Sequence, residues 1–379
     1  MAIEKNDNCR VTITGYSSEG MGITRIDGIV VFVKNALAGE VCDVQILKTL
    51  KNCAYARIVE VVTPSAHRRE PDCPNYGRCG GCDFRHMDYA EECSAKQERV
   101  QNALQRIGGC ELEPEPFCGA GETTHYRNKC QFPISVSGNI GFYRARTHEV
   151  IPMTDCLIQS PVAAKIAAVV QEYIAKNGVS GYNEISGKGL LRHLFVRVNA
   201  KGECLCCLLA NGTALPCEEE LIAAIRAAVP ETVGIVLGIH RKPGNGVLGE
   251  RYRTLWGVNS LTDTLGALEF RLSVPSFYQV NREMAQTLYG KVLDFAQLTG
   301  KETVLDLYCG IGTITLTLAK AAKHVIGAEI VPEAIADARE NAARNGVQNV
   351  EFFCGDAGAV AEKLAADALA PDLICVDPP

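Results

Sequence analysis

The first 63 residues carry short apolar runs that glycines separate. The runs are rich in β-branched residues and lie at positions 11–14, 28–33, 40–47 and 55–62. Such composition favours strands. Glycines at positions 15, 20, 22, 28 and 39 supply turns between them. Short strands at regular spacing over about 55 residues are typical of a small closed barrel of the OB kind, so residues 1–63 are expected to form a β-barrel domain.

From Thr303 the pattern changes to strands that alternate with helices. Strands are expected at 303–308, 324–330, 349–354 and 372–376, with helices at 312–322, 332–346 and 359–367. This order predicts a parallel, doubly wound α/β sheet of the Rossmann-like kind over residues 263–379. Ligands of such sheets bind at the carboxyl ends of the strands. Residues 64–262 lie between these two patterns and are expected to form a central α+β domain, with one helix from Asp88 to Ile107 that Gly108 and Gly109 end.

The composition of the 379 residues fits a globular, multidomain protein, with 47% hydrophobic and 22% charged residues. No run approaches 18 uncharged apolar residues, which argues against a membrane span, and the first ten residues do not resemble a signal peptide. The 18 cysteines of so long a chain indicate metal ligands and buried thiols rather than disulfides. A cytoplasmic, monomeric protein is expected.

The negative charge lies in the last part of the chain. Residues 301–379 hold 6 Lys and Arg against 12 Asp and Glu, which equals the net charge of −6 of the whole sequence. The remaining residues contain three acid-poor basic runs. These are Arg127, Lys129, Arg144 and Arg146; Lys188, Arg192, Arg197 and Lys201; and Arg241, Lys242, Arg251 and Arg253. Three such runs in one region predict an RNA-facing surface.

Three cysteines stand in a loop rich in Gly and Pro, at Cys73, Cys79 and Cys82. Thiolates at this Cys-x5-Cys-x2-Cys spacing can converge on one metal centre, either zinc or a [4Fe–4S] cluster, and both need a fourth ligand. Spacing alone leaves Cys110, Cys118 and Cys156 open for that position. The Cys-x3-Cys-x2-Cys pattern of radical enzymes is absent.

The first strand of the α/β pattern ends in Asp306-Leu-Tyr308-Cys-Gly310-Ile-Gly312. Thr315 replaces the third glycine that a nicotinamide dinucleotide fingerprint requires. Acidic residues close the next strands, at Glu329, Asp356 and Asp377, the last within Asp377-Pro-Pro379. This arrangement is similar to the S-adenosylmethionine (SAM) site of class I methyltransferases. Amino-methyltransferases also carry Asp-Pro-Pro, so this motif alone leaves the substrate open.

The segment from Pro275 to Tyr289 resembles the RNA uridine C5-methyltransferases, whose Phe-x-Gln-x-Asn motif matches Phe277, Gln279 and Asn281. Residues 15–46 resemble their RNA-binding TRAM domain, and the cysteine loop resembles their [4Fe–4S] region, whose distant fourth cysteine matches Cys156. The resemblance implies a cluster on Cys73, Cys79, Cys82 and Cys156. It also implies SAM contacts at Gln279, Tyr308, Gly310, Gly312, Thr313, Glu329, Asp356 and Asp377. Phe277 is a candidate to stack on the target base, or else a core residue.

The resemblance also implies the reaction. A cysteine thiolate adds to uracil C6, C5 then accepts the methyl group, and a glutamate removes the C5 proton. In the family both groups follow Asp-Pro-Pro, so they are expected after Pro379. No nucleophile is assigned within the chain, and the 379 residues alone are expected to be inactive. The alternative is a non-catalytic iron–sulfur RNA-binding protein. Among RNAs, 23S rRNA is expected rather than tRNA.

Overall fold

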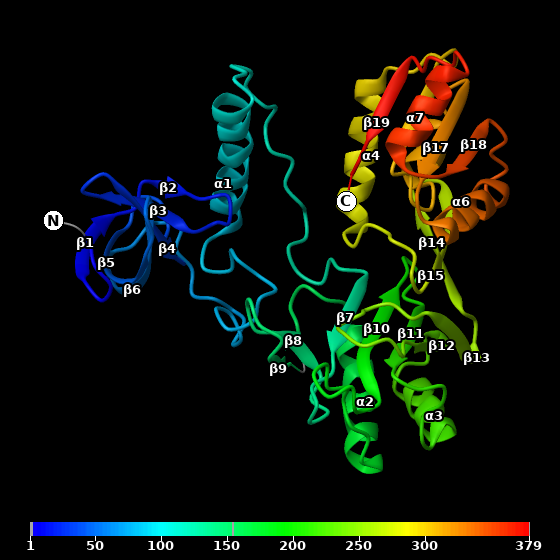
Figure 1. Cartoon of the computed structure of the whole chain (residues 1–379), viewed down its shortest axis with the longest axis horizontal. Helices are drawn as coiled ribbons and strands as arrows, with labels where there is room; N and C mark the ends of the chain where they lie inside the picture. The colour runs from blue at the N-terminus through cyan, green and yellow to red at the C-terminus, as the bar shows by residue number, and fades with distance from the viewer. Residues whose placement is uncertain (1–2, 154, 379) are drawn as a thin grey trace. The chain divides into compact units, whose positions relative to one another are not determined.

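The computed structural model describes residues 3–153 and 155–378, and the chain divides into two compact units (Figure 1). The first unit is Met1–Thr123 with Phe142–Ile151, and the second is Thr124–Gly141 with Pro152–Pro379. Within the described residues, no helix combines the length and the apolar character that crossing a membrane requires.

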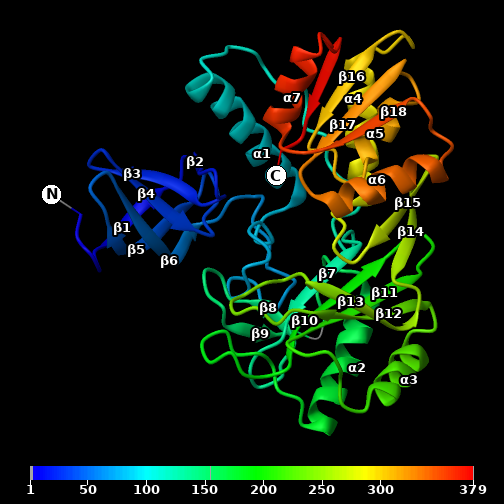
Figure 2. The same ribbon diagram turned by 45° about the vertical axis from the view of Figure 1, so that its right-hand side comes forward.

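The first unit is built on a six-stranded sheet that curves around its own core (Figure 2). Its strands are β1 (Asn8–Thr12), β2 (Gly15–Tyr16), β3 (Gly22–Ile26), β4 (Ile29–Lys34), β5 (Val41–Thr49) and β6 (Cys53–Thr63), in the order β1-β5-β6-β4-β3-β2. Alternate residues of the central strands point inward, and Val31, Val33, Val44 and Ile46 are all fully buried. The expected small β-barrel fold is therefore confirmed, and β2 and β3 are strands that the apolar runs did not mark.

Helix α1 (Tyr89–Asn102) follows the cysteine loop of the first unit and continues into the π-helical turn η1 (Ala103–Ile107). Asp88 caps the helix because its side chain accepts a hydrogen bond from the Glu91 amide at 3.0 Å. Gly108 ends the helical segment, as the sequence predicts. The short strands β8 (Gly141–Tyr143) and β9 (Val150–Pro152) pair with each other.

The second unit begins with a five-stranded sheet in the order β13-β12-β11-β10-β7. The strands are β7 (Lys129–Pro133), β10 (Leu191–Val198), β11 (Cys204–Ala210), β12 (Thr232–Ile239) and β13 (Arg251–Gly257). Helices α2 (Pro161–Asn177) and α3 (Glu218–Ala228) pack on this sheet and on each other. The central strand β11 is buried along its whole length, so Cys204, Cys206 and Cys207 are core residues as expected.

A hairpin of β14 (Ser260–Leu265) and β15 (Leu268–Ser273) leads through a loop into helix α4 (Arg282–Ala296). The α/β part follows with β16 (Thr303–Leu307), α5 (Thr313–Leu318), β17 (His324–Glu329), α6 (Pro332–Arg344), β18 (Val350–Cys354), α7 (Ala357–Ala366) and β19 (Leu373–Val376). Its sheet has the order β18-β17-β16-β19, and every pair in it is parallel. The predicted parallel α/β architecture is confirmed.

Neighbouring residues of each strand point to opposite faces of this sheet, and helices cover both faces. Val304 and Val325 belong to a core shared with α4, α5 and α6. Leu305 and Ile326 belong to a second core that α7 closes. The strand β19 lies at one end of the sheet order, and its residues Ile374 and Val376 are each 55% exposed.

Candidate functional site

The loop after β16 turns sharply where the sequence places its two glycines. Tyr308, Gly310 and Gly312 all have positive φ, at 67°, 56° and 84°. A side chain at Gly310 would meet no atom within 4 Å, so glycine is needed there for its backbone conformation, with open space left beside it. Gly312 is the N-cap residue of α5 in the left-handed region. This loop, residues 308–312, is called the glycine loop below.

The carboxylates predicted from the sequence gather at the carboxyl ends of the strands. Because β16, β17, β18 and β19 are parallel, the residues that follow them meet at one edge of the sheet. Glu329 ends β17, and its carboxylate accepts hydrogen bonds from the amides of Gly310 at 3.2 Å and Val331 at 2.9 Å. Asp377 follows β19 and is exposed. Pro379 of the same motif lies outside the described residues.

Asp356 has a structural task in addition to its predicted one. It precedes α7 and caps that helix, because Oδ1 accepts hydrogen bonds from the amides of Gly358 and Ala359 at 3.0 and 3.1 Å. Its exposed side chain still lies at the carboxyl edge of the sheet, next to the end of β18.

Asp306 is a site residue that the sequence analysis quoted in its motif but did not select. Its side chain is fully buried, and Oδ2 accepts a hydrogen bond from the Thr315 hydroxyl at 2.5 Å. Oδ1 has no hydrogen-bond partner among the described residues. Burial raises the pKa of Asp306 to about 7, the Thr315 hydrogen bonds oppose this shift, and the charge of Asp377 adds to it. The first position of the glycine motif was the signal that could have identified it.

Tyr308 begins the glycine loop, and Thr313 directly follows it. The Thr313 hydroxyl lies 3.1 Å from the hydroxyl of Tyr289, which is buried on α4. Burial raises the pKa of Tyr289, and the charges of Asp377 and Asp306 contribute to this shift. Tyr308 is 40% exposed and leaves its ring accessible. Helix α4 is therefore joined through Tyr289 to the start of α5, directly after the glycine loop.

The loop that precedes α4, residues 275–281, presents one aromatic ring to solvent. Phe277 is 66% exposed, although its neighbours Ser276 and Tyr278 are buried. The alternative that Phe277 is a core residue is therefore wrong. The Gln279 carbonyl accepts a hydrogen bond from Asn128 at 2.9 Å, and the Asn281 side chain caps α4 by accepting one from the Met284 amide. The loop is thus held at both sides of the exposed ring and is called the Phe277 loop below.

Two arginines of the predicted RNA-facing runs are buried instead. Arg197 is 1% exposed and donates hydrogen bonds to the carbonyls of Ser273 and Ser276, at 3.0 and 2.6 Å. Arg192 is 4% exposed, lies over the ring of Tyr182 and donates to loop carbonyls. Their assignment to an RNA-facing surface is wrong, because both guanidinium groups satisfy backbone acceptors inside the second unit.

Other members of the basic runs are exposed but lie beside acids. Arg253 pairs with Glu218 at 2.6 Å, and Lys242 pairs with Glu250 at 3.0 Å. In the first unit, Arg144 is paired in the same way, with Glu149. The two arginine pairs are bidentate, so a phosphate that binds either guanidinium would have to displace a carboxylate.

The predicted cluster draws on cysteines of both units, with Cys73, Cys79 and Cys82 in the first unit. Cys156 belongs to the second unit. Across residues 3–153 and 155–378, no group of three or more His, Cys, Asp or Glu side chains is arranged to hold a metal. The cluster stays a prediction of the resemblance, and no reaction step is derived through it.

Comparison with known proteins identifies two parts of the chain. Residues 4–59 match the TRAM domain, and residues 298–377 match a methyltransferase domain. An RNA methyltransferase of Halalkalibacterium halodurans is 41% identical over 100% of this chain and 83% of its own length. An RNA methyltransferase of Clostridium acetobutylicum is 39% identical over 100% of this chain and 84% of its own length.

One solved structure shares the fold of nearly the whole chain. It is the tRNA (uracil-54, C5)-methyltransferase of Pyrococcus abyssi in complex with S-adenosyl-L-homocysteine, which aligns with a TM-score of 0.74 at 23% identity. The alignment covers 98% of this chain and 83% of that chain. The chain therefore belongs to the RNA methyltransferase family and joins a TRAM domain to a class I SAM methyltransferase fold.

Proposed function

We propose that this protein transfers the methyl group of SAM to C5 of a uridine in RNA. The observation that carries the proposal is the link between the Phe277 loop and the glycine loop. Helix α4 starts at the first, and the hydroxyl of its Tyr289 contacts that of Thr313, which directly follows the second. One helix thus connects a ring exposed for base stacking with the loop expected to bind the cofactor. The family membership and the Phe277-x-Gln279-x-Asn281 motif support the same reaction.

The charge of the site suits SAM, which carries a positive sulfonium and a positive ammonium group. Asp306, Glu329 and Asp377 place carboxylates around the glycine loop, and Asp306 Oδ1 is a buried acceptor without a partner among the described residues. A buried acceptor of this kind is costly unless a ligand or water satisfies it. When bound, SAM supplies an electrophilic methyl group. The open space at Gly310 would admit its methionine part, Glu329 would accept hydrogen bonds from the ribose hydroxyls, and Asp356 would bind the adenine edge.

The target base is assigned to the exposed face of Phe277. Enzymes that modify a base within RNA take it out of its stack and hold it against aromatic side chains. Phe277 offers such a face, and Gln279 two residues later lies on the same loop for contact with the cofactor. The Phe277 loop then sets the distance between uracil C5 and the methyl group, because its backbone is fixed from both sides.

Methyl transfer to C5 requires a thiolate that adds to C6, since uracil C5 is too weak a nucleophile by itself. Two thiols lie near the site, and neither fits this role. Cys309 is 5% exposed, and burial raises its pKa far above the usual range. Burial also raises the pKa of Cys375 to about 11, with help from the charges of Asp306 and Asp377. Both thiols are neutral at pH 7, so no described cysteine is assigned as the nucleophile.

The RNA is proposed to be 23S rRNA, because a TRAM domain with a cysteine loop is more typical of the rRNA enzymes. A tRNA is the second candidate, since the protein of similar fold from Pyrococcus abyssi acts on tRNA. Mapping 5-methyluridine in rRNA and tRNA from cells that lack the gene distinguishes them. Loss of one rRNA site supports the proposal, loss of a tRNA site supports the second candidate, and an unchanged 5-methyluridine pattern contradicts both.

Cofactor binding is tested with the protein itself. Titration of S-adenosylhomocysteine by calorimetry is expected to show one site, which Glu329→Gln weakens by about 10- to 100-fold, since hydrogen bonds to a charged group contribute about 1.5–3 kcal/mol. Glu351→Gln is the matched control, because Glu351 lies on the neighbouring strand β18 and is exposed. Equal affinity in both variants would contradict the assignment of Glu329.

A further inference from the structure

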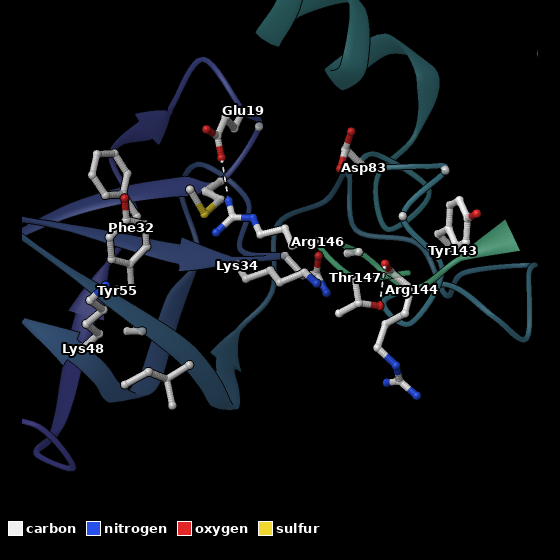
Figure 3. A pocket seen from close by; sticks show the side chains of 18 of the residues that line it. Glu19, Phe32, Lys34, Lys48, Tyr55, Asp83, Tyr143, Arg144, Arg146 and Thr147 are labelled. Carbon is white, nitrogen blue, oxygen red and sulfur yellow. Dashed lines mark hydrogen bonds and ion pairs between the residues drawn. The ribbon is translucent and has the colours of Figure 1, made fainter. Parts of the chain in front are cut away.

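A cleft of about 1000 Å³ opens within the first unit (Figure 3). One wall is the outer face of the TRAM barrel, from strands β4, β5 and β6. The other wall is the loop at residues 142–147 together with Gly80 and Gly81 of the cysteine loop. All of its lining residues belong to the first unit, whereas the residues assigned to methyl transfer belong to the second.

The barrel wall of this cleft carries two aromatic rings side by side. Phe32 on β4 is in register with Tyr55 on β6, and their ring centroids lie 5.4 Å apart. Lys48 on β5 is in register with the same Tyr55. The residues on either side of Phe32 are Val31 and Val33, which are fully buried. The barrel core is therefore filled from the other face, and the rings are not needed to complete it.

Positive side chains line both walls of the cleft. Lys34, Lys48, Arg144 and Arg146 line the cleft, against two acids, Glu19 and Asp83. Arg146 pairs with Glu19 at 3.1 Å, but the two side chains are 79% and 63% exposed. Such an exposed pair is weak and can open to a phosphate. Figure 3 shows Lys34 and Arg146 between the ring pair and the opposite loop.

Exposed apolar residues extend the floor of the cleft beside the rings. Leu47 and Leu50 line it and are 45% and 46% exposed. Aromatic faces, apolar edges and cations together match a nucleic acid whose bases are unpaired, because the bases stack on the rings while the cations contact the phosphates. An acidic peptide would use the cations but leave the ring faces without a partner.

We propose that this cleft binds a single-stranded stretch of the RNA substrate, with one or two unpaired bases on Phe32 and Tyr55 and the backbone along Lys34 and Lys48. The proposal rests on RNA as the substrate of the protein. It deepens that function by separating an anchoring site from the site of methyl transfer. Duplex RNA does not fit this recognition, because its bases are stacked and paired and cannot lie on the rings.

The test measures binding of a fluorescein-labelled single-stranded oligouridylate by anisotropy, with the 379-residue protein and without SAM. Tyr55→Leu and Phe32→Leu are each expected to weaken binding roughly tenfold, the order typical of one stacked base. Tyr55→Phe and Phe32→Tyr keep a ring and are expected to bind like the wild type. Phe295→Ala removes a ring that is 70% exposed on α4 and is expected to change nothing.

The role of Lys34 and Lys48 is tested through the salt dependence of oligouridylate binding. The double variant Lys34→Gln with Lys48→Gln is expected to reduce the slope of log K against log salt by about 1.4, since each phosphate contact on a single strand contributes about 0.7. The double variant Lys5→Gln with Lys165→Gln has the same net charge and is expected to keep the wild-type slope. Both control lysines are exposed and lie outside the cleft.

Three results would overturn the inference. They are unchanged binding in the ring variants, duplex RNA bound as tightly as the single strand, and equal slopes in the two lysine variants. Failure of the proposed function is separate, because that function is tested by the 5-methyluridine map of cells that lack the gene. An unchanged map, together with rings that oligouridylate binding needs, contradicts only the proposed reaction. Loss of a 5-methyluridine, together with rings that do not matter for oligouridylate binding, contradicts only the cleft.

Discussion

Arg197 Nη2 donates a hydrogen bond to the Ser276 carbonyl at 2.6 Å, from a side chain that is 1% exposed on β10. Ser276 in turn donates from its hydroxyl to Asp337 of α6 at 2.7 Å, and Arg271 donates to the same carboxylate at 2.8 Å. A buried network therefore holds the start of the Phe277 loop from the central sheet and from the methyltransferase helix. Burial lowers the pKa of Arg197 to about 10, so it stays charged at neutral pH.

Removing this guanidinium should destabilise the protein. Arg197→Met leaves the carbonyls of Ser273 and Ser276 without their donor, and each buried unsatisfied group costs about 1–3 kcal/mol. We expect the free energy of unfolding to fall by about 2–5 kcal/mol in urea titrations. Arg241→Met, at an exposed position, should stay within about 0.5 kcal/mol of the wild type. Equal stability of Arg197→Met and the wild type would show that Arg197 does not hold the loop.

Replacing Phe277 should affect RNA and spare the fold. Because the ring is 66% exposed, Phe277→Ala is expected to leave the free energy of unfolding within about 0.5 kcal/mol of the wild type. The affinity for a uridine-containing RNA should fall by about 5- to 100-fold, as for loss of one stacked base. Phe277→Tyr is the conservative control. A parallel loss of S-adenosylhomocysteine affinity would assign Phe277 to the cofactor instead of the base.

Asp306 should make the stability depend on pH. Its folded pKa of about 7 lies above the ordinary carboxyl value of 3.8, so the folded state holds the proton more tightly. This contribution is fully present below about pH 4 and is lost as the pH rises through 7. Asp306→Asn keeps an acceptor for Thr315 and removes the titration, so it should gain about 2–4 kcal/mol over the wild type at pH 8 and little at pH 4. The free energy of unfolding is measured in urea at both pH values. An equal gain at both would contradict the raised pKa of Asp306.

The iron–sulfur prediction is tested by measuring the iron, sulfide and zinc content of the protein. If the resemblance holds, protein prepared without oxygen contains about four irons and four sulfides, and serine at Cys73, Cys79, Cys82 or Cys156 lowers both. Serine at Cys110 or Cys118 should leave the content unchanged. Stoichiometric zinc, or the absence of both iron and zinc, would contradict the predicted cluster.

The expected inactivity of the 379 residues also stays a prediction. Because neither Cys309 nor Cys375 is a thiolate at pH 7, radiolabelled SAM should transfer no methyl group to unmodified rRNA or tRNA, while S-adenosylhomocysteine still binds. The matched measurement repeats the assay with Cys309→Ser. Turnover by the wild type that this substitution abolishes would place the nucleophile at Cys309.

The sequence by itself determined the elements and the order of the motifs. The β-branched runs between glycines in the first 63 residues and the strand–helix order after Thr303 predict their folds, because β-branched residues favour strands and alternating strands and helices favour a parallel sheet. Parallel strands put their carboxyl ends at one edge, so Glu329, Asp356 and Asp377 could be grouped before any coordinates were known. The glycine loop and its positive φ values follow from the same local chemistry.

Only the tertiary structure decided which polar residues face inward. Arg192 and Arg197 have the composition of a basic surface run, yet they lie on a strand whose two faces are both covered, and backbone acceptors far along the chain receive their hydrogen bonds. Asp306 stands out because burial leaves one of its oxygens without a partner among the described residues. The pair of Phe32 and Tyr55 exists only through the register of β4 with β6, which brings together residues 23 positions apart. Burial and register depend on contacts between distant segments, and a one-dimensional pattern does not contain them.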